Sequence, residues 1–522
     1  MHIANSFPDN AFSPSQGRNA PPPEVAAAFR RQRQRYGLLH FRRSLRFWWY
    51  RILLVLLGTV AAVVLGPLLF TFPKEIIGGA AVLVLFFWAI RRLEFGLVFL
   101  AILTTAFSPK AVSLKSVDIY PVEILAVMLF AAILVQSAFH IRKYTFPSFW
   151  TIWPQLGLIS LAVISEIMIQ VTWIPLVPHK LNTTPLIYSE ILAIFMYCIP
   201  MVIMLITSAG LSLNEQLVEK IENWFLGLAV TAALVVGFEF RRIGADIYTF
   251  RYTEPVIIYM SLRSLAQLMA LAAMISYARF LTAVRWKQRI IYGVALVLTL
   301  AGVYFTLENS WWVELAVAMI VITLMFSRRL LLAFCILCLP LIPLVKAELT
   351  KLQTVKSADA YRLIIWQDAL RIWGKRPILG VGPGNFWSYD QVYTHLPFLL
   401  RNFDTTGLGV AHNGMLQTLG ELGPLGVVCL FAFVVVVFLT AWRMFRRSTS
   451  PDKRNDRILG LVCMGLVIGS LAGDFFSGSF FLPPRQIGSF KDLPQVLSTW
   501  IIFGCLFYRD KIWRLAQKNN QR

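Results

Sequence analysis

The sequence predicts an all-α fold, a polytopic integral membrane protein with one large extracytoplasmic loop. Of its 522 residues, 57% are hydrophobic and only 15% are charged, whereas about a quarter of the residues of a soluble protein are charged. Apolar stretches long enough to cross a bilayer recur along most of the chain. Clusters of Lys and Arg lie at every second connection between them, which is the pattern of cytoplasmic loops.

The apolar stretches predict about fourteen transmembrane helices. They lack the polar face that a surface helix of a soluble protein needs. The basic clusters at the two ends of the chain place both termini in the cytoplasm, which is consistent with an even number of spans. The approximate cores of the spans are 52–71, 76–90, 95–108, 120–139, 149–170, 186–209, 222–240, 256–278, 290–307, 311–327, 330–345, 414–442, 458–474 and 495–508.

The chain divides into five segments by composition. The first apolar stretch begins near Ile52, behind a polar arm, so it predicts an anchor rather than a cleaved signal peptide. The segments are a disordered and basic cytoplasmic arm (1–50), helices 1 to 11 (51–345), an extracytoplasmic catalytic loop (346–411), helices 12 to 14 (412–508) and a basic cytoplasmic tail (509–522).

The net charge of +22 raises the question of a nucleic-acid partner, and its distribution argues against one. The basic residues gather beside the apolar stretches, where anionic membrane lipids attract them. We therefore predict membrane lipids, and no nucleic acid, as their partners. All six cysteines lie in apolar stretches and are expected to be core residues, implying neither disulfides nor a metal site.

The loop 346–411 carries the residues that indicate chemistry, because a loop of this length is often functional. It contains a predicted helix, Tyr361–Trp373. After the helix comes a glycine-rich turn, in which the bare backbone of Gly382 and Gly384 can approach a ligand. The helix places four residues on one face at helical spacing, namely Arg362, Trp366, Ala369 and Trp373.

The loop closes on His412 and Asn413, directly before a helix that runs through Glu421. Histidine suits general-base catalysis because its unperturbed pKa is about 6.5, and the dipole at a helix start disfavours the imidazolium. Arginine suits a diphosphate because its planar fork binds two phosphate oxygens. Glu421 and His412 fall on roughly opposite helix faces, so we do not expect Glu421 to orient the histidine.

Taken in order, these segments resemble the signature of the O-antigen ligase and polymerase superfamily. The resemblance implies a metal-independent glycosyltransferase of the bacterial inner membrane, without a cofactor, whose donor is a polyprenyl-diphosphate-linked glycan. It also implies that His412 is catalytic and that Arg362 contacts the diphosphate. The pieces that carry it are Arg362-x-x-x-Trp-x-x-Ala-Leu, then Pro-x-x-Gly-x-Gly-x-Gly-x-Phe ending at Phe386, then His412-Asn413, and Glu421-x-Gly-x-x-Gly.

One position departs from the family pattern. Members often carry a Thr-x-Ser-Arg-Gly-like segment, and here Asn309 stands where the arginine is expected. We expect other residues on the outer side to contact the substrate. Arg263 falls inside a predicted span, where an arginine either indicates function or extends to the headgroups. The candidates are Arg263, Arg251, Arg241, Arg376, Asn413, Gly382 and Gly384.

Three functions stay open at this point. The first is a ligase that transfers a whole glycan, and the second is a polymerase of the same superfamily. The third is a flippase or transporter of lipid-linked sugars, which should place ionisable residues at the midplane of several spans. The acceptor hydroxyl is also open: a lipid-A core, a growing polymer, another surface glycan and a protein all fit.

Overall fold

The computed structural model of the chain describes residues 91–106, 112–114, 117–119, 121–172, 186–243, 262–306, 309–338, 356–386, 413–450, 453–477 and 493–520, together with Val84, Phe87, Trp88, Tyr389 and Ala411. The predicted segment 52–71, and most of 76–90, lie outside the described residues. All described residues belong to one compact unit, Val82–Arg522.

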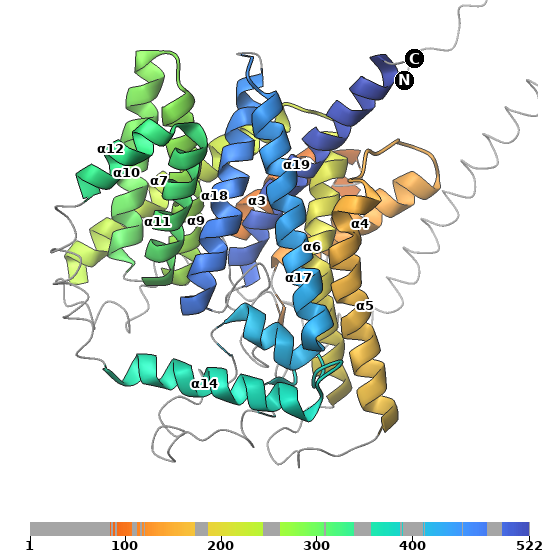
Figure 1. Cartoon of the computed structure of the whole chain (residues 1–522). Helices are drawn as coiled ribbons and strands as arrows, with labels where there is room; N and C mark the ends of the chain where they lie inside the picture. Colours follow the sequence, from red (N-terminus) through yellow and green to blue (C-terminus); the bar gives the residue numbers. More distant parts are fainter. Residues whose placement is uncertain are drawn as a thin grey trace, which may run out of the picture. The chain divides into compact units, whose positions relative to one another are not determined.

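The described residues are almost entirely helical (Figure 1). Each predicted apolar segment from 95–108 onward coincides with a helix. One departure from an all-α fold is a short antiparallel hairpin of β1 (Val112–Leu114) and β2 (Val117–Ile119). The helices are α3 (Leu93–Ala106), α4 (Pro121–Ala138), α5 (Phe149–Thr172), α6 (Leu186–Leu211), α7 (Leu217–Ile243), α9 (Leu262–Thr282), α10 (Trp286–Phe305), α11 (Asn309–Phe326), α12 (Arg328–Cys338), α14 (Lys356–Lys375), α17 (Gly414–Arg447), α18 (Arg454–Ser477) and α19 (Leu493–Asn520).

Six of the described helices are long and apolar enough to cross a membrane: α5, α7, α9, α10, α17 and α18. Apolar parts of α3, α4, α6 and α11 are shorter. The chain is therefore a multi-pass membrane protein, while the number of about fourteen spans stays a prediction. Within the predicted span 330–345, the described helix α12 ends at Cys338.

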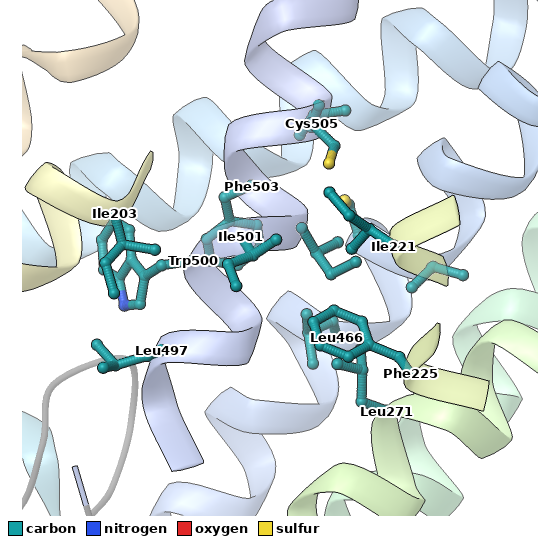
Figure 2. Close-up of a cluster of buried hydrophobic side chains, with 14 of the residues drawn as sticks. Ile203, Ile221, Phe225, Leu271, Leu466, Leu497, Trp500, Ile501, Phe503 and Cys505 are labelled. Atoms are coloured by element: carbon teal, nitrogen blue, oxygen red, sulfur yellow. The ribbon is translucent and has the colours of Figure 1, made fainter. Parts of the chain in front are cut away.

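Helix α9 lies at the centre of the packing. In the most apolar part of α9, 83% of the residues are buried. The helix contacts α7, α10, α11, α18 and α19. Figure 2 shows the apolar core beside it, where Leu271 of α9 lies near Phe225 of α7 and Leu466 of α18, and Trp500 of α19 lies near Ile203 of α6. These helices are far apart in the sequence, so their packing fixes the bundle.

Helices α11 and α18 approach closely along a stripe of glycines at four-residue spacing, Gly465, Gly469 and Gly473. A Cβ on Gly469 would lie 2.5 Å from the carbonyl oxygen of Glu314. Small residues let two membrane helices come into backbone contact in this way. The close contact brings the ends of α11 and α18 together beside the start of α17.

The predicted cytoplasmic clusters meet at one end of the helices. Arg454 donates to the carbonyl oxygen of Arg279 at 3.5 Å, which joins α18 to α9. Arg447 of α17 forms an ion pair with Asp510 of α19 at 2.9 Å. Because α17 begins at Gly414 and reaches this end at Arg447, the segment around His412 lies at the opposite end. This arrangement agrees with the predicted alternation, although which end faces the cytoplasm stays a prediction.

Candidate active site

Helix α14 contains the predicted helix 361–373 and lies across the ends of the bundle helices, beside the first turns of α17 (Figure 1). It forms a small hydrophobic core, separate from the main one, with the glycine-rich turn and Ala411. Its buried stripe is Ile365, Ala369 and Ile372, at helical spacing. The helix face that carries Arg362, Trp366, Ala369 and Trp373 shares only Ala369 with this stripe. Trp366 and Trp373 are half-buried beside the stripe.

Helix α17 has a kink that receives the glycine-rich turn. Gly423 has φ 71° and ψ −171°, and Pro424 follows it. Proline has no N–H, so the carbonyl of Gly420 lacks its usual helical donor. That carbonyl accepts from the N–H of Val381 at 2.9 Å, and the carbonyl of Glu421 accepts from the N–H of Gly382 at 2.9 Å. The kink therefore creates the acceptors that hold the turn.

The glycines of the turn are required by this close approach. Gly380, Gly382 and Gly384 all have positive φ angles, which residues with a side chain rarely adopt. A Cβ on Gly380 would lie 2.4 Å from the carbonyl carbon of Glu421, and one on Gly382 would lie 2.2 Å from the side chain of Ile169 in α5. Gly382 and Gly384 are buried. Their bare backbone approaches other parts of the protein, and a ligand contact stays a prediction.

The Glu421 side chain is fully buried beneath the turn. It accepts hydrogen bonds from Gln417 Nε2 at 3.0 Å and from the Tyr197 hydroxyl at 3.2 Å. The backbone N–H of Gly384 also donates to it. Glu421 therefore ties the turn to α17 and to α6, and its relation to His412 stays a prediction.

His412 lies outside the described residues, but both of its neighbours are fixed. Ala411 is buried in the small core of α14. Asn413 is the N-cap of α17, where its side chain accepts from the N–H of Leu416 at 3.0 Å. The N–H of Gly414 donates to both carboxyl oxygens of Asp474 in α18, at 2.9 and 2.8 Å. The backbone on either side of the histidine is thus held by α14, α17 and α18.

Asp474 was missed by the sequence reasoning. It is buried and lies at the end of a predicted span, where a carboxylate is costly and indicates a functional or structural role. That signal was available in the sequence. The partner of Asp474 could not be predicted from the sequence, because it is a backbone N–H that lies 60 residues earlier in the chain.

The other candidates lie on several elements. Arg362 is in α14, one turn before Ile365, and Arg263 is in the first turn of α9. The structure does not describe the side chain of either arginine. Arg251 lies outside the described residues. Arg241 is exposed near the end of α7. Arg376 follows α14 directly and is half-buried, and its carbonyl accepts from the N–H of Gly380 at 3.0 Å.

Residues 255–431 match a family model described as O-antigen ligase. This match supports the O-antigen ligase superfamily for this part of the chain. It contains every segment on which the resemblance depends, from Arg362 to Gly426, and the predicted resemblance is confirmed. No curated protein matches the chain. The family suggests an O-antigen ligase-type membrane enzyme, similar to a glycosyltransferase, with a lipid-linked glycan and an acceptor as partners.

Proposed function

We propose that the chain is a glycosyltransferase that moves a glycan from a polyprenyl-diphosphate donor to a hydroxyl acceptor at the outer face of the bacterial inner membrane. The observation that supports it is the O-antigen ligase match, which covers the segment where α14, the glycine-rich turn and the start of α17 are held together. Such a transfer needs a base for the acceptor hydroxyl and cations for the leaving diphosphate.

The proposed reaction has one displacement. The acceptor oxygen attacks the anomeric carbon of the donor, and the bond from that carbon to the diphosphate oxygen breaks. His412 takes the proton of the acceptor hydroxyl as general base. Arg362 binds the diphosphate and stabilises the charge that develops on it. Asn413 and Asp474 hold the backbone that follows His412 through the first N–H groups of α17.

Further substrate contacts belong to the same proposal. Arg263, in the first turn of α9, is proposed to supply the phosphate contact that Asn309 cannot make. Arg376 directly follows α14 and lies beside the turn, which suits a contact to the sugar chain or the diphosphate. The remaining proposed contacts are Arg251, Arg241, Asn413, Gly382 and Gly384.

The test of the base is His412→Ala in purified protein reconstituted in lipid nanodiscs, with a lipid-linked glycan as donor. We expect the transfer rate to fall by about 10²–10⁴, because that is the usual contribution of a general base, while the dissociation constant of the donor stays nearly unchanged. An active His412→Ala protein would remove the proposed mechanism. A protein that no longer binds donor would make the histidine a ligand rather than a base.

The test of the diphosphate contact is Arg362→Ala, measured as donor affinity in the same nanodiscs. We expect donor binding to weaken by about 1.5–3 kcal/mol, and Arg362→Lys to recover only part of it because an ammonium group replaces a two-point fork. Arg443→Ala is the matched control, since this exposed arginine lies near the other end of α17. Equal effects at both positions would indicate a general loss of charge and contradict a specific contact.

We also propose that no metal ion takes part, as the family resemblance implies. Transfer should then continue at an unchanged rate in the presence of a strong chelator. Loss of activity with the chelator, restored by Mg²⁺ or Mn²⁺, would contradict this.

A further inference from the structure

Helix α14 exposes apolar side chains on one flank, at right angles to the stripe that packs against α17. Leu363 is 57% exposed and Leu370 is 47% exposed, and they lie two turns apart. Trp366 and Trp373, also two turns apart, are half-buried between them and the buried stripe. At about 100° per residue, these four residues form a continuous apolar flank, and we use that name for them below.

The opposite flank of α14 is polar. Gln367, Arg371 and Lys375 follow one another at four-residue spacing, and all three are exposed. Arg371 forms an ion pair with the buried Asp368 at 2.8 Å. The helix therefore has three sides: one that packs on the protein, one that is apolar and one that is charged. A helix in water gains nothing from a separate exposed apolar side, and such patches usually mark a contact surface.

The apolar surface continues from α14 onto a membrane span. The Trp373 indole donates to the carbonyl of Pro377 at 2.9 Å, which fixes the chain at the end of α14. Ile378, the next residue, is 68% exposed, and its carbonyl lies against the α17 kink, 2.2 Å from where a Cβ on Gly423 would be. Beyond the kink, Leu425 and Val428 of α17 are 50% and 60% exposed.

These exposed α17 residues belong to a helix that is long and apolar enough to span a membrane, and lipid is the expected cover for apolar side chains on such a helix. We propose that α14 is an interfacial helix and that its apolar flank rests in the outer boundary of the lipid bilayer, with its polar flank in water. The occupant of the flank is thus phospholipid, at the level where headgroups meet acyl chains. Helices with separate apolar and cationic sides bind there, and tryptophan is enriched at that depth.

The interfacial position of α14 affects how the donor binds. This step rests on the proposed function. Arg362 lies in α14 one turn before Trp366, at the border between the apolar flank and the side that packs on α17. A polyprenyl diphosphate keeps its chain in the bilayer and its diphosphate at headgroup depth. An interfacial α14 therefore holds Arg362 at the depth of the group that it is proposed to bind, on the side from which a lipid arrives.

The experiment places a nitroxide on each flank of the full-length protein in phospholipid nanodiscs. Leu370→Cys reports the apolar flank and Lys375→Cys the polar flank, each in a background in which the native cysteines are replaced. Relaxation by oxygen, which concentrates in lipid, is compared with relaxation by a water-soluble nickel chelate. We expect oxygen to dominate at position 370 and the nickel chelate at position 375.

Two results would overturn the inference. Equal access of the nickel chelate at both positions would show that the flank faces water, and access of neither reagent at position 370 would show that protein covers it. Because the spectra do not depend on catalysis, this failure is separate from that of the proposed function. The functional arm is Leu363→Ser with Leu370→Ser, which should raise the KM for the long-chain donor several-fold and leave kcat unchanged. An unchanged KM would contradict the consequence for the donor.

Discussion

The Glu421 carboxyl connects three segments that are distant in the sequence: Tyr197 in α6, Gly384 in the turn and Gln417 one helical turn earlier in α17. All three groups donate to it. A buried donor that loses its acceptor costs more free energy than the hydrogen bond itself contributes, because it cannot return to water. The Glu421 side chain therefore helps to hold the turn above the start of α17, together with the backbone hydrogen bonds of Val381 and Gly382.

We predict that Glu421→Ala lowers the free energy of unfolding by more than Glu421→Gln does. The alanine removes the acceptor of three buried donors, and a buried donor that loses its acceptor costs about 1–3 kcal/mol, whereas the amide oxygen of glutamine still accepts at least one bond. The measurement is thermal unfolding of the purified protein in one detergent. A double-mutant cycle with Tyr197→Phe isolates the hydroxyl contact, and a coupling free energy near zero would contradict it.

The residues around His412 show how much of the site a sequence motif can predict. The sequence placed His412 and Asn413 at a helix start, and Asn413 is indeed the N-cap of α17. Asp474 could not be joined to them, because the contact is between a side chain and a backbone N–H from different helices. The roles of His412 and Arg362 stay predictions, since the first lies outside the described residues and the side chain of the second is not described.

At the scale of elements, α14 and α17 were both expected, but their contact was not. Spacing alone does not say which face of α14 packs on the protein, and the face that carries Trp366 and Trp373 shares only Ala369 with the packed stripe. The stripe that packs instead is set by Val381, Phe386 and Ala411, which approach from the turn and the end of the loop. The kink at Gly423 was likewise unexpected, although Pro424 removes a helical N–H there.

We predict that Gly423→Ala strongly destabilises the α14–α17 contact. The positive φ costs a residue with a side chain about 1–3 kcal/mol, and its Cβ would lie 2.2 Å from the carbonyl oxygen of Ile378. Gly374→Ala is the matched control, because a Cβ there meets no atom within 4 Å. Hydrogen exchange of the α14 backbone reports the contact directly. Equal protection in the two variants would show that the kink does not hold the turn.

For the whole molecule, the positions of the helices followed from the apolar stretches because a membrane requires every backbone group to be bonded within a helix. That requirement explains why the described helices from α3 onward match the predicted segments. It does not determine which helices pack together, and the central position of α9 was not predicted. The hairpin of β1 and β2 was not predicted, because it lies in the connection between two predicted spans, where the apolar pattern carries no information.

The orientation of the bundle is the last prediction. Basic residues of α9, α17, α18 and α19 gather at one end, and α14 lies at the other. The positive-inside rule places the basic end in the cytoplasm. Gln367 of α14 and Ser450, after α17, are both exposed, so Gln367→Cys and Ser450→Cys are suitable probes in a background without native cysteines. With a thiol reagent that does not cross the inner membrane, we expect intact cells to label position 367 and not position 450, and lysed cells to label both. Labelling of position 450 alone in intact cells would invert the topology, and the proposed reaction at the outer face would fail with it.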